Sequence, residues 1–218
     1  MNALYPALAA VVAYLVGSLS FAVIVSRVVG LKDPRTYGSK NPGATNVLRS
    51  GNKAAAVITL LLDGIKGWLP VALVKWFGPA YGLEDGTVAM VALAAFLGHQ
   101  YPVFFKFQGG KGVATAAGVL FGVHWILGLA TLATWVIVAY FSRYSSAAAL
   151  ASAAFAPTFY VIGDRVIWYA DKPVLFAVFI MSALLAVRHR ENINRLLQGK
   201  ESRLGGSSPD ATKNVAKH

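Results

Sequence analysis

Seven continuous apolar stretches, separated by short polar segments, run along almost the whole chain. None of them shows the polar face expected of a helix on the surface of a soluble protein. A helix that spans a bilayer needs about 20 residues at about 1.5 Å each; most of the stretches reach or approach that length, the fourth is short, and the seventh has to include flanking residues. The stretches cover Ala3 to Val29, Ala54 to Trp76, Val88 to Phe105, Val113 to Val123, Trp125 to Phe141, Ala147 to Ile162 and Val174 to Val187.

The composition agrees with a chain that is solvated by lipid. Hydrophobic residues make up 56% of the 218 positions and charged residues 13%, which is more apolar than a soluble domain of this length needs. The first stretch is about twice as long as the core of a signal peptide and has no positive segment before it, so we expect it to remain as a transmembrane helix. The sequence thus predicts an all-α, polytopic integral membrane protein.

The charges are segregated in a way that predicts the topology. The net charge is +11, yet residues 2–26 carry no charge, whereas residues 27–53 hold six Lys or Arg and one acid. Cytoplasmic loops are enriched in Lys and Arg, and seven crossings with the N-terminus outside and the C-terminus inside sort the basic residues best. Without a crossing at Val113 to Val123, the basic first loop or the basic tail would lie outside. We therefore expect one seven-helix membrane domain over residues 1–204 and a disordered polar tail over residues 205–218.

The first basic loop contains a turn suited to holding phosphate. Asn41, Pro42 and Gly43 form the turn, and the residues after it are expected to begin a helix whose free N–H groups face an anion. Arg49 adds a guanidinium that grips phosphate oxygens in a bidentate fork. The alternative is an ordinary turn with a solvated basic face. The candidate substrate-binding residues here are Ser39, Asn41, Gly43, Thr45, Asn46 and Arg49.

A second loop, Gly109-Gly110-Lys111-Gly112, runs directly into the fourth apolar stretch. The positive end of that helix, the glycine backbone and Lys111 would together form a cradle for an oxyanion or a phosphate. The loop departs from the Walker pattern, and no strand precedes it as a dinucleotide-binding fingerprint requires. A flexible glycine hinge is the alternative interpretation.

Two further segments are expected on the same face. Ser145 and Ser146 precede the sixth stretch, where capping the helix would by itself explain them. His189 and Asn192 follow the seventh stretch at a spacing of i and i+3, on one face of a helix that we expect to continue the last span. The alternative is a basic helix that only meets anionic headgroups.

Inside the bilayer, Asp63 and Lys66 are costly unless they pair, and their i,i+3 spacing permits an ion pair. His99, near the end of the third stretch, would brace the loops.

Several kinds of catalytic site are missing from the sequence. The chain has no cysteine, which excludes thiol nucleophiles and thiolate metal sites. It has no H-E-x-x-H zinc pair, no G-x-S-x-G elbow and no carboxylate cluster for two divalent metals. The H-x4-D pattern of common glycerolipid acyltransferases also fails, because Phe104 follows His99 and Asn194 follows His189 at that distance. We expect neither a metal nor a cofactor.

Three blocks in order resemble the bacterial acyl-phosphate:glycerol-3-phosphate acyltransferases of the inner membrane. They are Gly38-Ser39 with Asn41 and Gly43 to Asn46; Gly109 to Thr115; and His189 to Ile193. The similarity runs from Tyr14 to about Glu201, and the combination is highly specific. Two positions depart from the pattern: Lys40 replaces a glycine common in the first block, and Ala149 stands where some members have a second serine.

The resemblance implies a seven-helix fold in the bacterial cytoplasmic membrane with its active site at the cytoplasmic face. It implies transfer of a fatty acyl group from acyl phosphate to the 1-hydroxyl of glycerol 3-phosphate, giving lysophosphatidate. The two phosphates would lie against Arg49 and Lys111, and His189 with Asn192 would complete the glycerol phosphate site. The catalytic residues implied are Lys111, His189 and Asn192, and the substrate-binding residues include Gly109, Gly110, Gly112 and Ser146.

The partners expected are the two substrates and membrane lipids, with no nucleic acid and no obligatory protein partner. No side chain is suited to form an acyl-enzyme, so direct attack is expected, with either His189 or the substrate phosphate accepting the proton. A carrier for phosphorylated anions usually shows internal repeats and a site near the midplane, and neither is visible here. A structural lipid-binding protein would not require three separate glycine-rich motifs, so an enzyme is favoured.

Overall fold

The computed structural model describes residues 4–205. Its secondary structure is helical, without a strand in that range apart from one isolated bridge between Asp164 and Trp168. Within these residues, each of the seven apolar stretches lies mainly on helix. The elements are α1 (Leu4–Gly17), α2 (Phe21–Val28), α3 (Ala44–Leu48), α4 (Lys53–Phe77), η1 (Gly78–Tyr81), α5 (Asp85–Gln100), η2 (Val103–Phe105), α6 (Val113–Val123), α7 (Trp125–Ser142), α8 (Ser145–Ile162), α9 (Lys172–Arg188) and α10 (Arg190–Leu197).

Four of the helices, α4, α5, α7 and α8, are long and apolar enough to cross a membrane, and the number rises to six if the bent pairs α1 with α2 and α9 with α10 each form one span. Helix α6 is apolar but has only 11 residues. The fold is therefore that of an all-α polytopic protein with four to six candidate spans within residues 4–205. The seventh crossing, the membrane domain over residues 1–204 and the sidedness stay predictions.

The first span is broken, whereas a continuous helix was expected. Helices α1 and α2 meet at a bend of 41°. Lys66 of α4 donates to the carbonyl oxygen of Leu19 at 2.6 Å, inside the break, and the same ammonium lies 2.7 Å from the carboxylate of Asp63. The expected ion pair is thus confirmed. The Lys66 ammonium also gives a partner to a carbonyl group that the bend leaves without its helical hydrogen bond. In a bilayer no water is present to take that place.

The prediction that the last span continues through His189 is also wrong. Helix α9 ends at Arg188 and α10 begins at Arg190, with a bend of 58° between them. His189 forms the junction, and the side chain of Asn192 in α10 contacts Lys111 in the loop before α6. The expected polar tail over residues 205–218 lies outside the described residues, except for Gly205.

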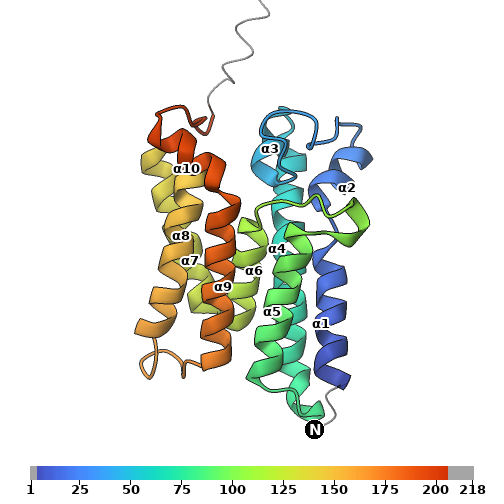
Figure 1. Ribbon diagram of the computed structural model, residues 1–218, viewed down its shortest axis with the longest axis vertical. Coiled ribbons are helices and arrows are strands. Elements are labelled where there is room, and N and C mark those ends of the chain that lie inside the picture. The colour runs from blue at the N-terminus through green and yellow to red at the C-terminus, as the bar shows by residue number, and fades with distance from the viewer. Residues whose placement is uncertain (1–3, 206–218) are drawn as a thin grey trace, which may run out of the picture.

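Small residues let α4 and α6 pack with their backbones in contact. A Cβ atom on Gly118 of α6 would overlap the carbonyl oxygen of Gly64 of α4, and one on Gly67 would overlap that of Thr115. Small residues of this kind let two helices approach closely. Helix α6 is thereby fixed in the middle of the bundle, as Figure 1 shows.

The helices run side by side along the long axis, and the two ends of the bundle differ. The upper end in Figure 1 carries α3, α10 and the connecting loops, and the N-terminus lies at the lower end. We call the upper part the site end; it comprises the loops over residues 30–52, 101–112 and 143–146 and the segment 188–204. We call the lower part the opposite end.

Candidate active site

Four segments that are far apart in the sequence meet at the site end. The ammonium of Lys111, in the loop before α6, donates to the side-chain oxygen of Asn192 in α10. The hydroxyl groups of Thr45 in α3 and Ser145 at the start of α8 lie 3.4 Å apart. A Cβ atom on Gly110 would lie 2.9 Å from the carbonyl oxygen of Pro42, so the two predicted phosphate loops are in contact. The structure thus brings residues of all four predicted segments together.

The glycines before α6 are packed in a way that no other residue permits. Gly112 precedes the first turn of α6 with a φ of +88°, a conformation that side chains disfavour, and a Cβ atom there would overlap the ring of Phe96. A Cβ atom on Gly110 would overlap the ring nitrogen Nε2 of His99. The glycines therefore let the loop before α6 pack directly against Phe96 and His99.

His99 lies directly beneath this loop, as expected of a bracing residue. Its Nδ1 atom is 3.1 Å from the hydroxyl of Thr115 in α6, and the same nitrogen is 3.7 Å from the carboxylate of Asp63. The ring is buried. A chain of polar contacts thus links the break in the first span to the underside of the glycine loop.

Within the first loop, the predicted residues divide into two groups. Helix α3 begins directly after Gly43, as expected from the turn. Asn46 is only 1% exposed, and its amide donates to the carbonyl of Pro34 at 2.6 Å while its oxygen accepts from the backbone of Ser39 at 3.1 Å. Asn46 therefore shapes the loop. Arg49 is exposed, and its guanidinium has no hydrogen-bond or ion-pair partner among residues 4–205.

Ser146 does not cap its helix, contrary to one expectation. The residue before α8 is Tyr144, with no side-chain capping bond, and the hydroxyl of Ser146 instead donates to Glu201 at 2.7 Å. The serines at this position thus face the site rather than the helix end.

Glu201 is a residue that the sequence interpretation missed. Its carboxylate accepts from Ser146, from the amide of Asn192 and from Nε of Arg195, the last at 2.7 Å. Although burial opposes ionisation, these hydrogen bonds hold the pKa of Glu201 below its usual range. It is the one acid between residues 192 and 204, and that isolated charge in a basic segment was the available signal. Glu201 fixes the position of Asn192, and through it that of Lys111.

Burial and neighbouring charge shift the two catalytic candidates. Burial, and next the positive charge of Arg195, lower the pKa of Lys111 to about 8. Burial also lowers the pKa of His189 to about 4. The Nδ1 atom of His189 lies 2.8 Å from the carbonyl oxygen of Leu185, which only accepts, so Nδ1 carries the proton and Nε2 keeps a free lone pair. His189 is therefore neutral at physiological pH.

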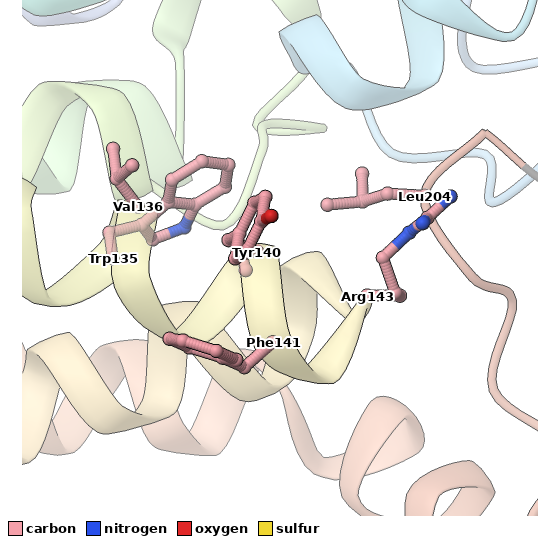
Figure 2. A pocket seen from close by; sticks show the side chains of 7 residues that line it. Trp135, Val136, Tyr140, Phe141, Arg143 and Leu204 are labelled. Carbon is pink, nitrogen blue, oxygen red and sulfur yellow. The ribbon is translucent and has the colours of Figure 1, made fainter.

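A groove of ≈ 670 Å³ lies on the surface of α7 near its C-terminal end. Figure 2 shows aromatic side chains of α7 along it, with Arg143 directed toward Leu204. None of the predicted site residues lines this groove, so it is distinct from the junction around Lys111. Within residues 4–205, no group of three or more His, Cys, Asp or Glu side chains is placed to hold a metal ion.

An apolar helical bundle whose loops gather cations at one end is the arrangement expected of a membrane protein that acts on anionic substrates. The chain belongs to the glycerol-3-phosphate acyltransferase family, whose model matches residues 7–199. It is accordingly an enzyme, an acyltransferase of phospholipid synthesis.

Relatives of the same description are similar over nearly their whole length. The glycerol-3-phosphate acyltransferase of Albidiferax ferrireducens is 65% identical over 205 residues, covering 94% of this chain and 92% of the relative. The glycerol-3-phosphate acyltransferase of Cupriavidus pinatubonensis is 64% identical over 196 residues, covering 90% of this chain and 95% of the relative.

A solved structure shares the fold. The glycerol 3-phosphate form of PlsY (YgiH), an integral membrane glycerol 3-phosphate acyltransferase, is 36% identical to this chain, with a TM-score of 0.84. The match covers 98% of this chain and 100% of the solved one. The lysophosphatidic acid form of the same enzyme has a TM-score of 0.83 at 36% identity, covering 93% and 96%. The chain is thus an integral, multi-pass membrane protein.

Proposed function

We propose that this protein transfers a fatty acyl group from acyl phosphate to the 1-hydroxyl of glycerol 3-phosphate, giving lysophosphatidate and phosphate. The junction of Lys111 with Asn192, beside a first loop whose Arg49 has no partner within residues 4–205, carries the proposal. Two phosphate-bearing substrates require two cationic positions, and the site end offers both. Glycerol 3-phosphate and lysophosphatidic acid are ligands of the solved relative, which supports the acceptor and the product.

The chemical step is a direct transfer. The 1-hydroxyl oxygen attacks the acyl carbon, the bond from that carbon to the phosphate oxygen breaks, and the hydroxyl proton passes to a phosphate. An acyl phosphate is an activated donor, so no acyl-enzyme is needed. Catalysis comes from holding the two substrates in register and from stabilising the oxyanion with Lys111 and the N–H groups before α6.

His189 orients the acceptor in this scheme. Its free Nε2 lone pair is suited to accept a hydrogen bond from the glycerol hydroxyl. A group whose pKa is lowered to about 4 is a weak base at neutral pH, whereas a phosphate monoester has a second pKa near about 6. The substrate phosphate is therefore the better proton acceptor.

The proposed setting is the bacterial cytoplasmic membrane, with seven crossings, the N-terminus outside and the site at the cytoplasmic face. The distribution of Lys and Arg supports this topology. Reporter fusions to the two termini and to the loops on either side of α6 test it. Finding both ends of α6 on one side of the membrane would contradict seven crossings.

The donor is tested with purified protein and labelled glycerol 3-phosphate. Acyl phosphate, acyl coenzyme A and an acyl carrier protein thioester are supplied in separate reactions, and lysophosphatidate is measured. We expect product with acyl phosphate alone. Equal use of a thioester would overturn the proposed donor, and isolation of a covalent acyl-enzyme would overturn direct attack.

A further inference from the structure

We propose that Arg188 is a positioning residue that orients the backbone of the loop before α6 toward the substrate phosphate. The inference rests on the phosphate-binding role proposed for that loop. Arg188 is the last residue of α9, half-buried, and directly precedes His189. Its contacts are to the loop backbone rather than to the open site.

One nitrogen of Arg188 holds three carbonyl groups. The Nη2 atom donates to the carbonyl oxygens of Gly109 at 2.9 Å and Gly110 at 3.1 Å, with a longer bond to that of Gln100 at 3.4 Å. The guanidinium also stacks over the ring of Tyr101, 5.4 Å from its centre. Hydrogen bonds from a charged donor are about twice as strong as neutral ones, so this arrangement fixes the direction of two consecutive peptide groups.

The direction of a carbonyl group determines where the next N–H points, because the two are opposed across a trans peptide plane. With the carbonyl of Gly110 turned to Arg188, the N–H of Lys111 points away from it. The carbonyl of Lys111 accepts from the amide of Gln100 at 3.3 Å, which turns the N–H of Gly112 away from Gln100. Within residues 4–205 neither N–H has an acceptor, so both remain available to an anion.

The other side of the loop is fixed separately. The N–H of Gly110 donates to the carbonyl oxygen of His99 at 3.2 Å, and the His99 ring fills the space beneath Gly110. Arg188 and His99 thus hold the loop from opposite sides. Without Arg188, the carbonyls of Gly109 and Gly110 would lose their charged partner and the peptide between Gly110 and Lys111 would be free to rotate.

The test compares Arg188→Ala with Arg190→Ala. The two substitutions remove the same charge from neighbouring positions, but Arg190 is exposed and has no side-chain partner among the described residues. We expect Arg188→Ala to raise the KM for glycerol 3-phosphate and the inhibition constant for inorganic phosphate by about tenfold or more, with a smaller change in kcat. Arg190→Ala should leave these values within about twofold. Equal effects of the two substitutions would overturn the proposal.

A double-mutant cycle separates positioning from direct substrate binding. Gly110→Ala displaces the loop that Arg188 holds, so adding Arg188→Ala to it should cost less than about threefold, because the two changes act on one element. Full additivity would mean that Arg188 acts elsewhere and would overturn the proposal. Arg188→Lys, whose ammonium stops short of the Nη2 position, should lie between the wild type and Arg188→Ala; wild-type kinetics in it would contradict positioning. This variant serves if the alanine variant does not fold.

Lys111→Ala, measured in parallel, distinguishes this inference from the proposed function. If Lys111→Ala is inhibited by phosphate as strongly as the wild type, the loop itself does not bind phosphate. If phosphate inhibition is weakened in Lys111→Ala but unchanged in Arg188→Ala, only the role of Arg188 is excluded.

Discussion

The two ends of the bundle both collect polar side chains, but they use them differently. At the opposite end, Lys75, Asp85, His124, Tyr160 and Asp171 surround a cavity of only ≈ 50 Å³. The polar groups there engage one another: the Lys75 ammonium donates to a carbonyl of α6, and the backbone N–H of Asp171 donates to the Tyr160 hydroxyl at 3.1 Å. Both of these donors thus have a partner within the protein.

At the site end, donors are left over. The guanidinium of Arg49 and the N–H groups of Lys111 and Gly112 have no acceptor within residues 4–205. Glu201 and Glu191 both pair with Arg195, so within residues 4–205 neither forms an ion pair with Arg49 or Lys111. Polarity alone therefore does not mark a site, and an unpartnered cation alone does not either, because Lys172 at the opposite end also lacks a side-chain partner within residues 4–205. The unpartnered donors at the site end are set apart by lying on the predicted phosphate loops.

The strongest way to break this comparison is to remove the two cations of the predicted phosphate loops. Lys111→Ala and Arg49→Ala should each lower kcat/KM about tenfold to more than a hundredfold, because losing a hydrogen bond to a charged group costs about 1.5–3 kcal/mol. Steady-state kinetics on purified protein provide the measurement. Lys172→Ala, which removes an exposed charge at the opposite end, is the matched control and should change little. Wild-type kinetics in Lys111→Ala would mean that its loop is only structural.

The titration of Lys111 sharpens the comparison. Because its pKa is lowered to about 8, the ammonium loses its proton as the pH rises through that value, and kcat/KM should fall by up to about tenfold per pH unit above it. Lys111→Arg keeps its charge throughout this range, so the alkaline limb should move to higher pH. An unchanged limb in that variant would assign the titration to another group.

A smaller effect is expected at His189. If it orients the acceptor, His189→Gln retains an acceptor oxygen and should keep kcat within about tenfold of the wild type. Loss of a general base typically costs about 10²- to 10⁴-fold. Single-turnover rates with saturating substrates separate the two outcomes, and a collapse of turnover with unchanged substrate binding would exclude the orienting role.

The smallest effect is expected at the opposite end. Burial, the charge of Asp85 and a hydrogen bond with that residue raise the pKa of Asp171. An acid whose folded-state pKa is raised favours folding when protonated, and this contribution is lost as the pH rises through that pKa. Asp171→Asn should therefore raise Tm slightly at pH 7, with a difference that shrinks toward pH 3.8, the ordinary value, and acyltransferase activity should not change. A loss of activity would show that the two ends are coupled.

The sequence predicted the helices well where composition alone decides them. The bounds expected for α6, α7 and α8 lie within two residues of those observed, because an apolar run between polar loops has one stable structure in lipid. The breaks at Leu19 and His189 were missed. At the first break the Leu19 carbonyl is met by Lys66 of another helix, a contact that no local pattern encodes.

In the candidate site, too, residue type and spacing predicted some features, and others depend on tertiary contacts. The contact of Lys111 with Asn192 joins two residues that the motifs had already singled out. Asn46, predicted to bind substrate, has its side chain engaged within the first loop, and Glu201 and Arg188 act through other residues. Roles of this kind are determined by tertiary geometry, which residue type and spacing do not specify.

The shortness of α6 has a consequence for where the chemistry takes place. Its 11 residues span about 16 Å, roughly half of the about 30 Å hydrocarbon core of a bilayer. In Figure 1 its glycine-bearing end accordingly starts below the level of α3 and α10. A polar reaction centre at that depth meets an acyl chain where the chain already resides, so under the proposed reaction a lipid-soluble donor reaches the water-soluble acceptor without leaving the membrane.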